Sequence, residues 1–193
     1  VVDGMQGGTG ATQECFIEHV GIPTLPAVRL ASDALKELGM HRDGVQLIVS
    51  GGIRTGADVA KAIALGADAV SIGTAALIAM GDNSPEYSED YSKIGTEAGF
   101  YEDWQAGNDP AGITTQDEIL SNRLDPIKAG QKLANYLNVL TLEAQTLARA
   151  CGKSHIRNLE PEDLNALTVE ASAMAKVPLA GTDWIPSGKK AED

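Results

Sequence analysis

The residues best placed to do chemistry in this sequence are small ones that follow two apolar runs, residues 46–49 and 69–72. These small residues are Ser50, Gly51, Gly52, Gly73 and Thr74. Where a strand ends in glycine before a helix, backbone N–H groups can approach an anion closely, because no Cβ holds its oxygens away. Two such turns on successive strands predict a phosphate site. The alternative is that the glycines only permit tight turns.

The residues between and before these runs predict the elements that would position such a site. Residues 55–65 have the apolar spacing of a helix, and Gly66 would end it. A strand, a glycine turn, a helix and a second strand are typical of a parallel α/β sheet with a right-handed crossover. A further buried strand is expected to end at Val1 and Val2, before a glycine-rich loop. We therefore expect this sequence to be the C-terminal portion of a longer polypeptide.

Four more helices are expected. They cover residues 13–20, residues 33–38 with Ser32 as cap, residues 126–151, and a stretch from the cap Asn158 to Lys176. The third helix has apolar positions at helical spacing, namely Leu133, Leu137, Leu140, Ala144 and Leu147. The expected division of the chain is a sheet-containing part over 1–80, an acidic ordered excursion over 81–125, helices over 126–177 and an extended tail over 178–193.

Composition excludes several classes of function. A net charge of −12 argues against binding a nucleic-acid backbone or an anionic membrane surface. The chain has no run of 18 apolar residues, so we expect no membrane span. Two distant cysteines, Cys15 and Cys151, form no disulfide framework, so we read both as reduced and either buried or incidental, and we expect a cytoplasmic protein. His19, His41 and His155 lie at no metal-ligand spacing, so no metal site is expected.

Two segments carry a resemblance to a known family. SGGIRTGADVAKAIALGADAVSIGTAALIAMG, residues 50–81, resembles the phosphate-binding end of FMN-dependent barrel enzymes. DGMQGGTGAT, residues 3–12, resembles the glycine-rich segment of the glutamate synthase FMN domain. The resemblance implies an α/β fold that is the C-terminal part of a (β/α)8 TIM barrel, strands 6 to 8, followed by a helical C-terminal extension. Strands 1 to 5 would lie upstream.

The same resemblance implies a cofactor and its site. The cofactor would be FMN, with its phosphate bound by the loops after strands 7 and 8, which contain Ser50, Gly51, Gly52, Gly73 and Thr74. The segment that approaches the flavin and the substrate would contain Gln6, Gly7, Gly8 and Thr9. Arg54 would bind the phosphate or a substrate carboxylate, or would only face solvent at the start of a helix. The catalytic side chains would lie upstream of this sequence.

The sequence departs from the family after residue 81. Glutamate synthase carries a three-cysteine iron–sulfur motif at this place, whereas residues 81–125 of this sequence contain no cysteine. NDPAGITTQD, residues 108–117, resembles the end of that motif, with Asp109 where a ligand thiolate is expected. Carboxylates do not replace thiolates in such clusters, so we expect no iron–sulfur cluster from this chain. The excursion is expected to be ordered because its aromatic residues need packing partners; they are Tyr87, Tyr91, Phe100, Tyr101 and Trp104.

Three segments, DPAGITTQD (109–117), NYLNVLTLEAQTLARACGKSH (135–155) and NLEPEDLNALTVEASAMAKVPLAGTDWIP (158–186), resemble the FMN subunit of methylamine–glutamate N-methyltransferases, or N-methylglutamate synthases. That resemblance implies conversion of glutamate and methylamine to N-methylglutamate and ammonia, through a flavin-mediated iminoglutarate. One alternative is a glutamate synthase-like subunit that aminates 2-oxoglutarate with ammonia from a glutaminase partner. Another is a non-catalytic scaffold subunit. The implied partners are a glutaminase-like subunit and a glycine-repeat β-helix subunit.

Overall fold

A small parallel sheet lies at the centre of the computed structural model, which describes residues 1–7, 14–41, 44–99 and 107–186. Its strands are β1 (Val2–Asp3), β2 (Ile48–Ser50) and β3 (Ala69–Ser71), in the order β1-β2-β3. All pairs are parallel, with Val49 opposite both Val2 and Val70. The predicted parallel α/β arrangement is confirmed, and each strand overlaps its predicted position, with ends that differ by at most two residues.

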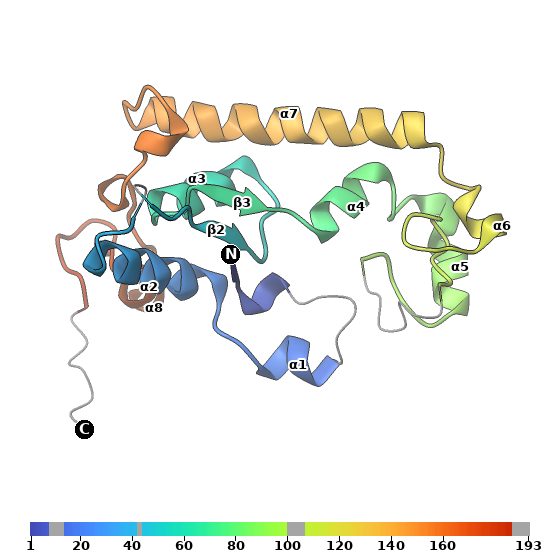
Figure 1. The fold of residues 1–193 in the computed structure, drawn as a ribbon, viewed down its shortest axis with the longest axis horizontal. Helices are drawn as coiled ribbons and strands as arrows, with labels where there is room; N and C mark the ends of the chain where they lie inside the picture. The colour runs from blue at the N-terminus through green and yellow to red at the C-terminus, as the bar shows by residue number, and fades with distance from the viewer. Residues whose placement is uncertain (8–13, 42–43, 100–106, 187–193) are drawn as a thin grey trace.

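Helices on the crossovers cover this sheet (Figure 1). After η1 (Met5–Gly7) and α1 (Glu14–His19), α2 (Thr24–Glu37) precedes β2, and α3 (Gly56–Ala64) connects β2 to β3. Thr55 caps α3 through a reciprocal capping box with Asp58. The apolar face of α3 packs into an aliphatic core that also contains Val28 and Val49. The predicted helix over 55–65 is therefore confirmed.

The prediction that Ser32 caps a helix over 33–38 is wrong. Ser32 lies inside α2 and is fully buried, with Oγ 3.4 Å from His41 Nε2. The helix starts earlier because Pro26 is tolerated in its first turn, where the missing N–H would have no acceptor within the helix. The Ser32 hydroxyl, which caps no helix, lies beside Gly66. A Cβ at Gly66 would collide with the Ser32 side chain.

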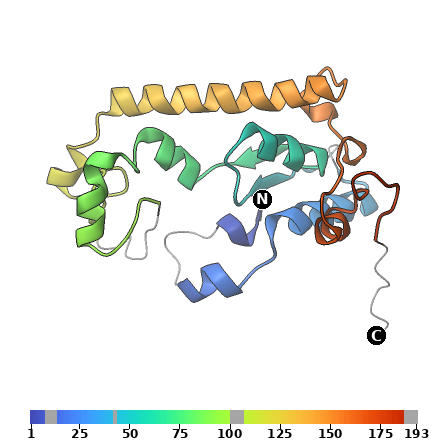
Figure 2. The same ribbon diagram turned by 180° about the vertical axis from the view of Figure 1, so that it is seen from behind.

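A 25-residue helix, α7 (Pro126–Ala150), runs along one side of the molecule and packs on α3 and α4 (Thr74–Met80) (Figures 1 and 2). Asp125 caps it, and Gly152 follows it with a positive φ. Of the apolar positions at helical spacing, Leu140 and Ala144 are buried, whereas Leu137 and Leu147 are 41% and 38% exposed. The predicted helix is confirmed.

The prediction of a continuous helix from Asn158 to Lys176 is wrong. The chain forms two short 3-10 turns, η4 (Ile156–Asn158) and η5 (Pro161–Asp163), before α8 (Val169–Ala175). Helix α8 is capped by Thr168 and lies beside α2 (Figure 2). Buried Ala166 explains the interruption, because its N–H and C=O bond to Pro178 and Ala180 instead of to a helical turn.

The excursion after α4 contains η2 (Pro85–Tyr87), α5 (Ser88–Lys93) and α6 (Glu118–Ser121). Of the five predicted packing aromatics, Tyr91 is buried and Tyr87 is half-buried, whereas Phe100, Tyr101 and Trp104 lie outside the described residues. Both cysteines are exposed, so of the two alternatives for Cys15 and Cys151 the buried one is excluded and the incidental one remains. Within residues 1–7, 14–41, 44–99 and 107–186, no helix is both long and apolar enough to span a membrane.

Candidate cofactor site

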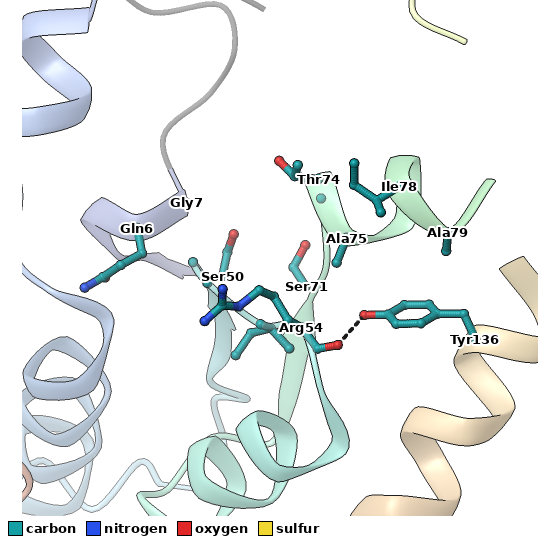
Figure 3. A pocket seen from close by; sticks show the side chains of 14 residues that line it. Gln6, Gly7, Ser50, Arg54, Ser71, Thr74, Ala75, Ile78, Ala79 and Tyr136 are labelled. Carbon is teal, nitrogen blue, oxygen red and sulfur yellow. Dashed lines mark hydrogen bonds between the residues drawn. The ribbon is translucent and has the colours of Figure 1, made fainter. Parts of the chain in front are cut away.

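A cavity of about 670 Å3 lies at the carboxyl ends of the strands (Figure 3). Eight predicted site residues line it together: Gln6, Gly7, Ser50, Gly51, Gly52, Arg54, Gly73 and Thr74. The predicted residues Gly8 and Thr9 lie outside the described residues. Because carboxyl ends of parallel strands meet at one edge of a sheet, three loops that are distant in sequence surround one space.

The glycines at this edge have different physical reasons to be glycine. Gly51 has a φ of +116°, and a Cβ there would lie 2.5 Å from Thr24 Oγ1 and 3.0 Å from the carbonyl oxygen of Gly4. The fold itself therefore requires glycine at this position. A Cβ at Gly73 would meet nothing within 4 Å, and φ of Gly73 is negative. The tight-turn explanation thus accounts for Gly51 but leaves Gly73 unexplained.

Gln6 contributes to the wall mainly through its backbone position. Its Oε1 accepts hydrogen bonds from Thr24 N at 2.7 Å and Thr24 Oγ1 at 2.8 Å. Figure 3 shows its side chain directed away from Thr74. The side-chain amide therefore connects η1 to the start of α2 by hydrogen bonds and is not directed into the cavity.

The start of α3, which borders the cavity, is already capped by the chain. The Gly56 N–H donates to Glu143 Oε2 of α7 at 2.7 Å, and the Asp58 N–H donates to Thr55 Oγ1 at 3.3 Å. Gly73, the N-cap of α4, offers no side-chain acceptor. An anion in the cavity would therefore meet the loops around Gly51–Gly52 and Gly73–Thr74, rather than the first N–H groups of α3.

Arg54 provides the positive charge of the site. It is the only charged side chain among the described residues that line the cavity. Its guanidinium is exposed and is directed toward Ser50 (Figure 3). In a chain of net charge −12, a cavity whose one charged side chain is an arginine favours a small anionic group.

Six further lining residues were not predicted. They are Ile53, Ser71, Ala75, Ile78, Ala79 and Tyr136. Tyr136 comes from α7, and its hydroxyl donates to the carbonyl oxygen of Arg54 at 2.8 Å (Figure 3). Burial, and secondarily the negative charge of Asp58, raise the pKa of the Tyr136 phenol, so it remains a hydrogen-bond donor. Its position four residues before Leu140 was a signal that it faces the core side of α7.

A second polar region lies beyond α4, in the excursion. Tyr91 Oη lies 2.9 Å from Asp82 Oδ1 and 3.0 Å from Asp109 Oδ1, and all three residues are buried. Asp109 also accepts from the N–H groups of Ala111, Ile113 and Thr114. The residue at the expected thiolate position is thus a carboxylate that organises its own loop by hydrogen bonds. Among the described residues, no group of three His, Cys, Asp or Glu side chains is arranged to hold a metal ion.

Comparison with known proteins agrees with this arrangement. Residues 1–85 match the family model described as the conserved region in glutamate synthase. The chain is 70% identical over 186 residues to the glutamate synthase large subunit-like protein of Rhizobium meliloti (strain 1021), covering 96% of this chain and 42% of that protein. This chain is therefore similar to glutamate synthase.

More distant relatives of this glutamate synthase-like chain carry a related name. It is 41% identical over 159 residues to the archaeal glutamate synthase [NADPH] of Methanocaldococcus jannaschii, with 82% of this chain and 28% of that protein covered. It is 39% identical over 159 residues to the archaeal-type glutamate synthase [NADPH] of Thermotoga maritima, again covering 28% of that protein. The chain thus spans less than half the length of these relatives.

The family-model match includes most of the cavity but omits its wall from α7. Every described lining residue except Tyr136 lies within residues 1–85. Tyr136, which bonds to Arg54 before α3, and Glu143, which bonds to Gly56 at its first residue, lie outside the matched region. These two contacts are therefore features of the structure that the family match does not describe.

Proposed function

We propose that this chain forms the FMN-phosphate side of a glutamate synthase-type enzyme, with β1, β2 and β3 as strands 6, 7 and 8 of a (β/α)8 barrel. One observation carries the proposal: the loops after all three strands converge on one cavity whose only charged lining residue, among those described, is Arg54. The loops after strands 7 and 8 form the usual phosphate site of such barrels. The cavity size of about 670 Å3 is in the range of small-molecule sites.

The lining residues fit a phosphate attached to a planar ring. The space beside Gly73 is one that a Cβ would fill, so glycine there lets phosphate oxygens approach the backbone N–H groups. Arg54 would pair with the phosphate, and the hydroxyl of Ser50 would donate to it. The apolar side chains of Ile78 and Ala79 would exclude water from the neighbouring part of the cavity. FMN, when bound, would supply reversible hydride transfer.

We further propose that the enzyme forms N-methylglutamate and ammonia from glutamate and methylamine. This exchange of amines is redox-neutral, so it requires no external electron donor. The Asp109 loop supports a reaction without an iron–sulfur cluster. Hydrogen bonds from three backbone N–H groups to Asp109 hold this loop in place, so it needs no bound cluster to order it. Glutaminase-like and glycine-repeat subunits are proposed as partners of the native enzyme.

A second candidate function is amination of 2-oxoglutarate with ammonia and an external reductant. The names of the archaeal and archaeal-type relatives, glutamate synthase [NADPH], favour it. It uses the same cavity and cofactor, and it differs in needing two electrons per turnover. The electron source is therefore the property that distinguishes the two reactions.

An absorption spectrum of the full native protein tests the cofactor, and paired assays test the reaction. Flavin bands, together with N-methylglutamate formation from glutamate and methylamine without NADPH, are the expected results. Product formation only from 2-oxoglutarate, ammonia and NADPH would favour the second candidate. A native protein that neither contains nor takes up FMN would overturn the flavoenzyme proposal and favour a scaffold role.

A further inference from the structure

The turn that carries Arg54 is held in place by side chains from two helices. The Arg54 N–H donates to Asp58 Oδ2 of α3 at 3.0 Å. The Arg54 carbonyl oxygen accepts from the Tyr136 hydroxyl of α7 at 2.8 Å. Two residues later, the Gly56 N–H donates to Glu143 of α7 at 2.7 Å. The backbone of Arg54 is thus fixed on both sides, while its side chain remains exposed in the cavity.

Helix α7 is built to make both of its contacts at once. Tyr136 and Glu143 are seven residues apart, which is about two helical turns, so both lie on the face toward α3. Gly56 allows the two helices to approach closely, because a Cβ there would collide with the Leu140 carbonyl oxygen and the Ala144 nitrogen. The position of the Tyr136 hydroxyl relative to Arg54 is therefore set by the packing of α7 on α3.

We propose that Tyr136 is a positioning residue of the cofactor site, acting through the backbone of Arg54 to hold its guanidinium where it binds the phosphate. The inference rests on the proposed function, since it takes FMN as the ligand. It extends the site to the C-terminal helix, and it gives α7 a role besides packing. Tyr136 acts here through its hydroxyl, whereas its ring contributes to the cavity wall.

Tyr136→Phe in the full native protein tests the proposal, because it removes the hydroxyl and keeps the ring. Flavin-free protein is titrated with FMN and with riboflavin, which has the same ring system without the phosphate. Loss of one ordinary hydrogen bond is expected to weaken FMN binding about fivefold. Riboflavin binding is expected to be unchanged, because Arg54 has no phosphate to contact. Tyr87→Phe, the same change in η2 away from the cavity, serves as the matched control.

A double-mutant cycle separates positioning from general loosening of the fold. In an Arg54→Ala background, Tyr136→Phe is expected to cause no further loss of FMN affinity, because the group that it positions is gone. An equal loss for FMN and riboflavin, or an additive loss in the double mutant, would overturn the proposal. FMN binding by the unchanged protein with an unaltered dissociation constant in Tyr136→Phe would overturn it as well. Absence of FMN binding in the unchanged protein would instead overturn the proposed function, and this inference with it.

Discussion

Helix α4 separates two polar regions that are built in opposite ways. At its start, Gly73 and Thr74 border a cavity, and a Cβ at Gly73 would meet only open space. Just after its end, Asp82 joins a buried network with Tyr91 and Asp109, in which the chain supplies the hydrogen-bond partners. A polar region saturated by its own chain stabilises the fold, whereas one that faces open space is available to a ligand. The contrast separates structural from ligand-binding polar groups without reference to any relative.

The largest effect is expected from removing the centre of the saturated region. Asp109→Ala would leave the N–H groups of Ala111, Ile113 and Thr114 without their acceptor. The buried Tyr91 hydroxyl would keep only Asp82 as its acceptor. The free energy of unfolding should fall by about 3–4 kcal/mol. Urea denaturation of the native protein measures it. Asp117→Ala, the same change at an exposed helix cap, is the control and should cost only about 1 kcal/mol.

Near-equal losses for Asp109→Ala and Asp117→Ala would break the comparison. They would mean that the N–H groups of the Asp109 loop can turn to water at no cost in free energy of unfolding. The hydrogen bonds around Asp109 would then not be what stabilises this region. Asp109→Asn should lie between the two, because one amide oxygen retains part of the acceptor set while the NH2 group cannot accept.

A smaller loss of stability is expected at the cavity, at Gly51, where the fold requires glycine. Gly51→Ala would place a Cβ against Thr24 and the Gly4 backbone at a φ of +116°. The free energy of unfolding should fall by about 2–3 kcal/mol. The same urea titration measures it. An unchanged midpoint would show that the β2 loop adjusts freely, and glycine at this position would then need a different explanation.

Gly73→Ala is expected to affect binding rather than folding. Since a Cβ there meets nothing within 4 Å in this chain, the free energy of unfolding should change by less than about 0.5 kcal/mol. The dissociation constant of FMN should rise about tenfold, because the methyl group would occupy the space of a phosphate oxygen. Fluorescence titration measures it, with Gly130→Ala, also in open space but on α7, as the control. Loss of stability without loss of affinity would reverse the assignment of this region.

Much of the cavity edge was predictable because its signals are local. The apolar runs before Ser50 and Gly73 and the Thr55–Asp58 capping box each lie within a few residues. The strand ends and the start of α3 therefore followed from adjacent residues alone. Parallel strands bring their carboxyl ends to one edge, so the meeting of the loops followed from the strand order.

The elements that were missed depend on contacts between distant segments. Ser32 resembles a helix cap locally, but the fold uses it in the interior of α2 next to Gly66. The segment after Asn158 has helical composition, but Ala166 bonds to Pro178 and Ala180 instead. The role of Tyr136 depends on how α7 crosses α3, which no local pattern specifies. Tertiary contacts thus override local preference at these positions.

The smallest effect is expected in the pH dependence of the free energy of unfolding, to which the buried Tyr91 contributes. Burial, and then the hydrogen bonds and charges of Asp82 and Asp109, raise the pKa of the Tyr91 phenol. The unfolded chain loses this proton near pH 10, whereas the folded chain retains it. The contribution of Tyr91 is therefore complete below about pH 10 and is lost as the pH rises further, by about 1.4 kcal/mol at pH 11. Urea midpoints of Tyr91→Phe should decline less steeply above pH 10 than those of the unchanged protein. Tyr87→Phe, which lies outside the Tyr91–Asp82–Asp109 network, is the control and should retain most of the decline. Equal slopes for Tyr91→Phe and the unchanged protein would show that burial and the two carboxylates do not hold the Tyr91 phenol protonated.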